Sequence, residues 1–372
     1  MKILSEDGIK VPLLLRIFNR RLKVSLNSVD IKDHFEAIRE TIRSREIGIY
    51  IHFPFCKAVC LFCPYFRVIW NEKRFKAYYN ALINEIRVYG ENLKDLNLNV
   101  VEIHAGGGTP SIAPPYFWKE VLDVINEYFN IKDGIGVGIE ANPEDFANED
   151  KVYRFIDSGV YEVSIGGQSF NQKVLRVLGR KHSSTEIEKA IENAQNAGYK
   201  WINVDLMYMP PSIKSIIEFS LDELINIFKK DLESLIEFNI DQITYYPTLI
   251  PINSVGWKLA EKGMLRQPIE YFDKFIETAL SAFENTGYEM RRVYAFSKKG
   301  YEYATVNLEM IGPLIGFGPS AWSNTGYYQY VNVHSIDEYV DSLINLKLPH
   351  ILSRRISRTS ALIRFIFDQL FY

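Results

Sequence analysis

The stretch Val101-Glu-Ile-His-Ala-Gly106-Gly-Gly108-Thr-Pro110 shows how this chain is built. A short and mostly apolar segment runs into three glycines and a proline, and a helical pattern follows at residues 115–129. Apolar runs that end in turn residues are typical of buried strands. The stretch therefore predicts a strand, a turn and a helix, with the glycines at the C-terminal end of the strand.

The same unit recurs along the chain from residue 46 onward. Strands are predicted at residues 47–53, 100–105, 136–141, 162–167, 201–208 and 241–247. Helices are predicted between them at residues 73–91, 115–129, 150–157, 171–178, 184–197 and 216–239. This alternation indicates a parallel α/β sheet, because parallel neighbours need long crossover connections. From the pattern alone, the units fit either a doubly wound sheet or an incomplete barrel.

Two further regions flank this alternation. Residues 1–45 form an N-terminal extension with helical periodicity at residues 31–43. The alternation stops at Ile250, and a smaller mixed region of helical and strand-like patterns follows. That region includes a predicted helix at residues 271–285 and predicted strands at residues 288–295 and 314–317. We therefore expect an extension (1–45), a barrel (46–250) and a C-terminal substrate-facing region (251–372).

Composition restricts the partners and the location. Of the 372 residues, 47% are hydrophobic and 24% are charged, which is typical of a globular protein. The net charge is −3 and both signs are scattered along the chain, so no nucleic-acid partner is expected. The first residues lack an apolar signal core, and no uninterrupted apolar run reaches about 18 residues. We expect a cytoplasmic protein without a membrane span.

All three cysteines, Cys56, Cys60 and Cys63, lie within eight residues directly after the first predicted strand. An odd number rules out complete pairing in disulfides, and such clustering in a cytosolic chain indicates a metal site. A zinc ion held by three thiolates and His52 is one interpretation. The other is a cubane iron–sulfur cluster with three thiolate ligands and one open iron.

Further motifs surround the cysteines in a fixed order. They are Tyr50-x-His52-x-Pro54-Phe55-Cys56, Gly106-Gly107-Gly108-Thr109-Pro110-Ser111, Glu140-Ala141-Asn142-Pro143, Ser164-Ile-Gly166-Gly-Gln168-Ser-Phe170, Leu178-Gly-Arg180-x-His182, Asn203-Val-Asp205-Leu-Met-Tyr208 and Gly316-Phe-Gly318-Pro-Ser320-Ala321. Together with the C-x₃-C-x₂-C spacing, these motifs resemble the radical S-adenosyl-L-methionine (SAM) superfamily. Within it, they resemble the oxygen-independent coproporphyrinogen III oxidase and heme chaperone (HemN/HemW-like) branch, over roughly residues 47–325. The resemblance implies an incomplete (β/α)6 TIM-type radical SAM barrel that binds a 4Fe–4S cluster and SAM.

The resemblance also implies a role for each site residue. Cys56, Cys60 and Cys63 would ligate the cluster, and Tyr50 would act at the reacting centre. The SAM contacts would come from Tyr50, Phe62, Gly107, Gly108, Thr109, Glu140, Gln168, Arg180 and Asp205. In the oxidase branch, a segment similar to residues 316–321 helps to bind a second SAM, so one SAM or two are expected.

The sequence differs from the oxidase pattern at several positions. The oxidases carry a fourth cysteine two residues after the third, where this chain has Tyr65, and an aromatic residue there resembles the chaperone branch. The His-Asn-x-x-Tyr-Trp stretch usual in both branches corresponds here to residues 306–311, which lack the histidine and both aromatics. A common Gly-Leu-Pro is replaced by Met209-Pro210-Pro211.

Three functions therefore remain open. The first is a radical SAM oxidoreductase that resembles coproporphyrinogen III oxidase, acts in porphyrin or heme biosynthesis and abstracts hydrogen from a C–H bond. The second is a HemN-like radical SAM C-methyltransferase that uses a second SAM, and the third is a heme chaperone without oxidase activity. Each implies a small-molecule ligand, and the enzymes imply a one-electron donor such as flavodoxin or ferredoxin.

Overall fold

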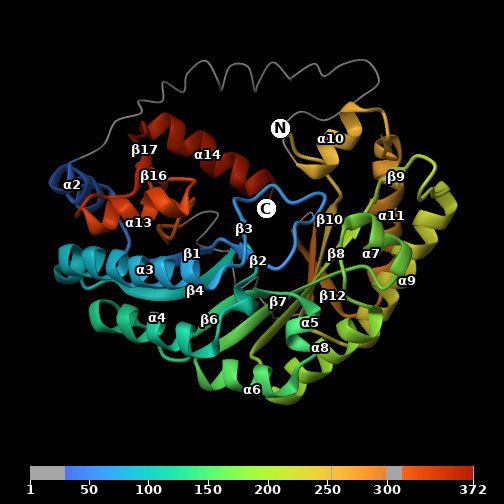
Figure 1. Cartoon of the computed structure of the whole chain (residues 1–372), viewed down its shortest axis with the longest axis horizontal. Helices are drawn as coiled ribbons and strands as arrows, with labels where there is room; N and C mark the ends of the chain where they lie inside the picture. The colour runs from blue at the N-terminus through green and yellow to red at the C-terminus, as the bar shows by residue number, and fades with distance from the viewer. Residues whose placement is uncertain (1–29, 253, 293, 299–311, 372) are drawn as a thin grey trace.

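In the computed structural model, residues 30–252, 254–292, 294–298 and 312–371 are described (Figure 1). Its centre is a sheet in which six strands are parallel neighbours. They are β1 (Glu46–Phe53), β4 (Asn99–Gly107), β6 (Val137–Ala141), β7 (Val160–Gln168), β8 (Trp201–Tyr208) and β10 (Gln242–Pro247). These strands adjoin in chain order, whereas a doubly wound sheet reverses its order part-way. The predicted fold class is confirmed: the sheet is an incomplete barrel.

Strands of the C-terminal region extend this sheet at both edges. Beside β1, β14 (Leu314–Phe317) pairs in parallel, and β15 (Trp322–Asn324), β16 (Tyr328–Asn332) and β17 (His350–Arg355) follow in antiparallel pairs. Beside β10 lie β13 (Ala295–Lys298) and then β12 (Tyr288–Arg292). The strand predicted at residues 288–295 is wrong, because the chain reverses before Ala295 and pairs with itself. Residues 1–29 and 299–311, which include the segment 306–311, lie outside the described residues.

Short strands complete the description of the sheets. The pair β2 (Phe55–Cys56) and β3 (Val68–Ile69) frames the cysteines, β5 (Asn130–Ile131) joins the edge of β4, and β9 (Ser212–Ile213) pairs with β11 (Leu265–Arg266). The pair β2–β3 therefore closes the segment that carries all three thiols into a loop.

Helices cover the outer face of the sheet (Figure 1). The described helices are α2 (Ile31–Thr41), α3 (Glu72–Leu93), α4 (Pro115–Tyr128), α5 (Pro143–Phe146), α6 (Glu149–Asp157), α7 (Gln172–Leu178), α8 (Ser184–Ala197), α9 (Leu221–Glu237), α10 (Val255–Glu261), α11 (Phe272–Phe283), α13 (Ile336–Ile344) and α14 (Arg358–Phe371), with 3₁₀ turns at Lys94–Leu96, Pro110–Ile112 and Ile269–Tyr271. Of these, α10 and α14 lie at the top of the view in Figure 1, away from the outer face. The prediction that began one helix at residue 216 is wrong. That helix, α9, begins after Ser220, whose hydroxyl accepts the backbone N–H of Glu223.

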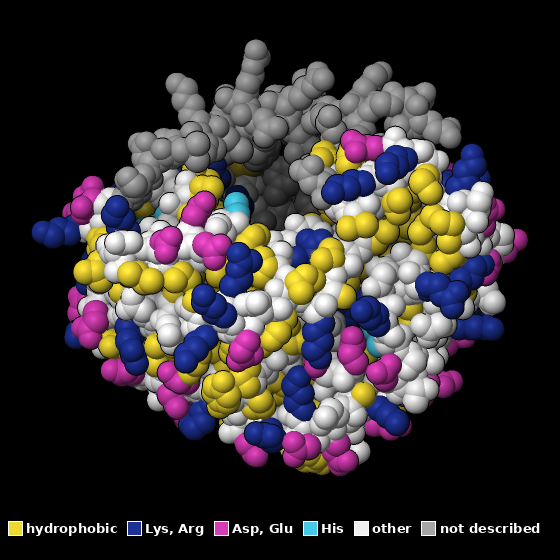
Figure 2. Space-filling view, in the orientation of Figure 1, with side chains coloured by type: hydrophobic (Ala, Val, Ile, Leu, Met, Phe, Trp, Pro, Cys, Tyr) yellow, Lys and Arg dark blue, Asp and Glu magenta, His cyan; other side chains and the backbone are white. Residues whose placement is uncertain are grey.

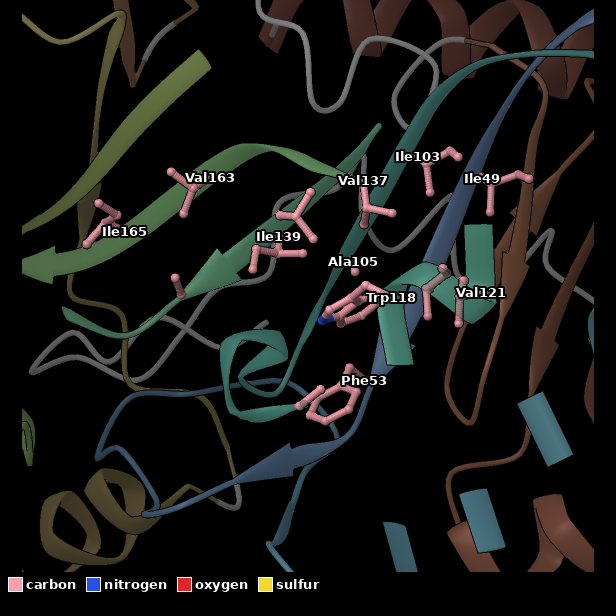
Figure 3. Close-up of a cluster of buried hydrophobic side chains, with 14 of the residues drawn as sticks. Ile49, Phe53, Ile103, Ala105, Trp118, Val121, Val137, Ile139, Val163 and Ile165 are labelled. Carbon is pink, nitrogen blue, oxygen red and sulfur yellow. The ribbon is translucent and has the colours of Figure 1, made fainter. Parts of the chain in front are cut away.

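The main core lies between the sheet and these helices. Phe53 of β1 and Ala105 of β4 lie beside Trp118 of α4, and Ile49 and residues of β6 and β7 add further aliphatic side chains (Figure 3). Because side chains alternate along a strand, Tyr50 lies on the opposite face of β1. One face of each strand therefore builds the core, and the other supplies polar groups to the barrel interior.

One face of the described surface carries charges of both signs. Lysine, arginine and acidic side chains are interspersed over the face in Figure 2. Within the described ranges, none of the helices has the length and apolar character needed to cross a membrane.

Candidate active site

A cavity of about 790 Å³ lies at the C-terminal ends of the barrel strands. One side is the cysteine loop (residues 56–63), and the other sides come from the ends of β4, β6, β7, β8 and β10. Every predicted site residue except Tyr50 lines it. The residues brought together are Cys56, Cys60, Phe62, Cys63, Gly107, Gly108, Thr109, Glu140, Gln168, Arg180 and Asp205.

The three thiols of the cysteine loop are free of disulfide bonds. The Thr109 hydroxyl donates to Cys56 Sγ at 3.5 Å, and Arg180 Nη1 donates to Cys60 Sγ at 3.6 Å. Burial raises the pKa of the Cys56 thiol to about 11 and raises the pKa of Cys63 as well. These thiols hold their protons until a metal displaces them, so metal binding at this loop releases protons.

The glycine turn packs directly against the cysteine loop. Gly107 has φ +97°, and a Cβ there would lie 2.3 Å from the ring of His52. A Cβ on Gly108 would lie 2.5 Å from the carbonyl oxygen of Phe53. The backbone N–H groups of Gly108 and Thr109 donate to the carbonyls of Phe53 and Phe55, both at 2.8 Å. The glycines thus allow the end of β4 to dock on the residues that precede Cys56.

His52 is not placed as a zinc ligand. Its Nε2 contacts the carbonyl oxygen of Phe66 at 2.9 Å, and its Nδ1 contacts the Tyr50 hydroxyl at 3.2 Å. Burial lowers the pKa of His52 to about 4, so the ring is neutral. Among the described residues, no three or more histidine, cysteine or acidic side chains lie close enough together to hold a single metal ion. Both ring nitrogens therefore already have protein partners. Because the ring also lies against Gly107, His52 supports the glycine turn.

Glu140 and Asp205 bring two carboxylates to the cavity. Glu140 Oε2 accepts the backbone N–H of Gly107 at 3.3 Å, and Glu140 Oε1 lies 3.8 Å from Nε2 of His104. Asp205 accepts Ser164 Oγ at 3.0 Å and Asn203 Nδ2 at 2.7 Å. Burial and the nearby charge of Glu140 raise the pKa of Asp205 to about 7. The pair suits a ligand that carries positive charge or hydroxyl groups.

Arg180 is oriented by the end of β7 and by α5. Its Nη2 donates to Asn142 Oδ1 at 2.9 Å and to the carbonyl of Gly166 at 2.8 Å. The neighbouring His182 is buried, with its Nε2 2.9 Å from the carbonyl of Gly167. Gln168 ends β7 with φ 66°, a conformation that is uncommon outside glycine and often found at ligand sites.

Tyr50 has a different environment. Its hydroxyl contacts His52, and its ring stacks on His104 at 6.2 Å between ring centroids. In the described part of the chain, Tyr50 does not line the cavity. Its catalytic role stays a prediction.

Close packing requires glycine at two positions of residues 316–321, the segment predicted to bind a second SAM. A Cβ on Gly316 would lie 2.4 Å from the carbonyl oxygen of Trp322, and one on Gly318 would lie 2.5 Å from that of His52. The Gly318 N–H donates to the buried Glu85 carboxylate at 2.8 Å, and Asn332 Nδ2 donates to the Gly318 carbonyl. Close packing therefore accounts for these glycines, and the second SAM stays a prediction.

Sequence reasoning assigned no role to several residues that support the site. Ser164 and Asn203 hold Asp205, and Asn142 holds Arg180. All three lie within motifs quoted above, so their position in the motif was the available signal. Lys57 and Asp145 form an ion pair at 2.8 Å beside the cysteine loop. No motif marks Asp145, because an acid in the first turn of a helix is common.

Comparison with known proteins shows which family this chain is similar to. The family model of the radical SAM superfamily matches residues 50–219. A heme chaperone, HemW, from Lactococcus lactis is 28% identical over 257 residues, which cover 68% of this chain and 62% of that protein. An oxygen-independent coproporphyrinogen III oxidase from Helicobacter pylori is 25% identical over 281 residues, covering 75% of this chain and 59% of that one. The chain thus spans less than two thirds of the length of these two relatives.

A solved structure shows the fold. Coproporphyrinogen III oxidase (HemN) from Escherichia coli, described as a radical SAM enzyme, superposes with a TM-score of 0.79 at 20% identity, over 100% of this chain and 85% of that one. The superfamily implies a 4Fe–4S cluster and bound SAM. Residues 50–219 are therefore a radical SAM domain, and the chain is similar to the branch of that superfamily that contains the oxygen-independent coproporphyrinogen III oxidases and the heme chaperones.

Proposed function

We propose that this chain is a radical SAM enzyme that holds a 4Fe–4S cluster on Cys56, Cys60 and Cys63 and cleaves SAM reductively. One observation carries the proposal: the three thiols and the polar ends of four neighbouring strands line the same cavity. Thiolates are the usual ligands of such clusters, and three of them leave one iron open for a further ligand. The hydrogen bonds that Cys56 Sγ and Cys60 Sγ accept would also stabilise these sulfurs once they bind the cluster as thiolates.

The chain's own residues would bind and orient SAM. Glu140 and Asp205 offer carboxylates to the ammonium and hydroxyl groups of SAM. An ammonium only donates hydrogen bonds, so it would be recognised by acceptors such as these carboxylates. Arg180 has five N–H donors, three of which are used by Cys60, Asn142 and Gly166, so donors remain for a carboxylate.

The other wall of the cavity would exclude water. It is formed by apolar and aromatic side chains that include Phe62, Met207, Leu249 and Tyr294. When bound and reduced, the cluster supplies the electron that splits SAM into methionine and a 5′-deoxyadenosyl radical. Exclusion of water by these side chains would protect a reactive intermediate from side reactions. An external one-electron donor, such as flavodoxin or ferredoxin, would reduce the cluster.

For the reaction that follows, we propose hydrogen abstraction from a C–H bond of a porphyrin precursor, as in the oxidases. A heme chaperone is the second candidate, and one observation favours it. Tyr65 occupies the place of the fourth oxidase cysteine, lines the cavity and is 57% exposed. The similarity to HemW from Lactococcus lactis points the same way.

The test is anaerobic reconstitution with iron and sulfide, followed by SAM and dithionite. We expect the wild-type chain to form methionine and 5′-deoxyadenosine, and Cys60→Ala to form neither. Carbon dioxide released from added coproporphyrinogen III would identify an oxidase, and S-adenosylhomocysteine would identify methyl transfer. Stoichiometric heme binding without 5′-deoxyadenosine would overturn the enzyme proposal in favour of a chaperone.

A further inference from the structure

Asp145 is a buried carboxylate, 3% exposed, close to the cysteine loop but outside every motif quoted above. Its Oδ1 accepts Lys57 Nζ at 2.8 Å and Lys151 Nζ at 2.9 Å, and its Oδ2 accepts Ser111 Oγ at 2.9 Å. Lys57 follows Cys56 directly, whereas Lys151 belongs to α6. A carboxylate is costly to bury, and these partners compensate that cost.

A series of hydrogen bonds also connects the Asp145 carboxylate with a second cysteine, Cys60. Ser111 Oγ, which donates to Asp145, accepts the backbone N–H of Asn142 at 3.2 Å. Asn142 Oδ1 accepts Arg180 Nη2 at 2.9 Å, and Arg180 Nη1 donates to Cys60 Sγ at 3.6 Å. We call Lys57, Ser111, Asn142, Asp145 and Arg180 the Asp145 network. It reaches the loop beside Cys56 and again at Cys60.

The network links three separate elements around the loop. Ser111 lies in the 3₁₀ turn after the glycines, Asn142 and Asp145 lie at the start of α5, and Arg180 follows α7. None of these side chains is a cluster ligand in the proposed function. Outer partners of metal ligands fix the orientation of the ligands and tune the metal.

We propose that Asp145 is a positioning residue for the cluster-binding loop, fixing Lys57 beside Cys56 and orienting Arg180 toward Cys60. This inference rests on the proposed function, because it concerns how the loop holds its cluster. Lys57 keeps the loop in place for the three ligands. The N–H group of Arg180 stabilises the reduced cluster, since hydrogen bonds to the sulfurs and nearby positive charge raise the reduction potential.

The experiment compares cluster loss from reconstituted, anaerobic protein in the presence of a chelator, without SAM. Lys57→Met removes the ammonium on the loop, and Lys151→Met removes the ammonium that contacts the same Asp145 oxygen from α6. We expect Lys57→Met and Asp145→Asn to lose the cluster about tenfold faster than wild type. Lys151→Met should stay within about twofold of wild type, since it leaves the loop contact intact.

A second readout separates positioning from simple stability. The midpoint potential, followed by electron paramagnetic resonance, should be lower in Asp145→Asn and in Asn142→Ala, because Arg180 is released from Cys60. A purely structural Asp145 would lower the melting temperature and leave the potential unchanged, which would overturn the proposal. If Asp145→Asn does not fold, the two lysine variants still decide, because Lys57 is more than half exposed.

Two further results would overturn the inference while the proposed function stands. One is a wild-type rate of cluster loss in Lys57→Met, and the other is equally fast loss in Lys57→Met and Lys151→Met. Wild-type protein that assembles no cluster at all would instead refute the proposed function. The two failures are therefore distinguishable.

Discussion

Two buried carboxyl groups, Asp145 near the cysteine loop and Asp205 in the cavity, are held in opposite ways. Asp145, beside the cysteine loop, has two lysine partners and one hydroxyl. Asp205, on β8, accepts hydrogen bonds from two neutral donors, Ser164 and Asn203. Paired charges fix a geometry, whereas a carboxylate held by neutral groups keeps its charge available for a ligand. Asp145 therefore fixes the position of the cysteine loop, whereas Asp205 on β8 can interact with a bound ligand.

The neutral partners of Asp205 continue away from the cavity. Thr244 Oγ1 donates to Asn203 Oδ1 at 2.8 Å, Gln242 donates to Thr244 at 3.1 Å, and Ser297 donates to Gln242 at 2.8 Å. These residues are buried. The donors all point toward Asp205, so the chain of hydrogen bonds holds that carboxylate in one orientation without supplying a full positive charge.

The largest expected effect is on the cysteine side. Cys60→Ala removes a proposed cluster ligand, so SAM cleavage should fall below detection and the cluster absorbance should be lost. Iron and sulfide analysis, together with 5′-deoxyadenosine formation, measures both. A variant that still cleaves SAM would show that Cys60 is not a ligand.

On the β8 side, Asp205→Asn should separate SAM binding from cluster binding. The amide keeps the size of the carboxylate and can bond to Ser164 and Asn203, but it lacks the negative charge. We expect SAM cleavage to fall about 10- to 100-fold at normal iron content, as for loss of a hydrogen bond to a charged group. Asp241→Asn is the matched control, because Asp241 accepts the Ile202 N–H near the N-terminal ends of β8 and β10. Loss of iron in Asp205→Asn would contradict the separation.

The pH dependence of stability should also change in Asp205→Asn. The pKa of Asp205 is about 7 in the folded protein, above its value in the unfolded chain. Between about pH 4 and pH 7 the folded state therefore binds a proton that the unfolded chain lacks, so the free energy of unfolding falls as pH rises through this window. Removing Asp205 should flatten that fall by about 1–2 kcal/mol, a figure reduced because the carboxylate lines the cavity.

Urea unfolding of the cluster-free protein at several pH values measures this difference. Glu85 and Asp231, whose pKa values are also raised to about 7 by burial, are present in both proteins and cancel in the comparison. Parallel stability curves for wild type and Asp205→Asn would show that Asp205 does not titrate in this range.

The smallest effect on SAM cleavage is expected for Thr244→Val, two hydrogen bonds from Asp205. Valine keeps the shape but removes the donor to Asn203, so the free energy of unfolding should fall by about 1–3 kcal/mol. SAM cleavage should change less than in Asp205→Asn. Urea unfolding and the cleavage assay decide, and a larger loss of cleavage than in Asp205→Asn would refute the order proposed for this chain of hydrogen bonds.

The sequence predicted the parts of the molecule that depend on local patterns. The six barrel strands are apolar runs that end in turn residues, and every predicted site residue except Tyr50 lines one cavity. The pairing of β1 with β14 joins residues far apart in the chain, so no local pattern could predict it. Asp145 was missed for the same reason: its partners Lys57 and Ser111 lie on other elements, and only the fold brings them together.

The most direct test of the central claim is Mössbauer and electron paramagnetic resonance spectroscopy of the anaerobically reconstituted wild-type chain, with and without SAM. We predict about four irons per chain in one cubane cluster, with one iron whose signal changes when SAM is added. A single zinc ion, or a cluster whose spectra ignore SAM, would contradict the account.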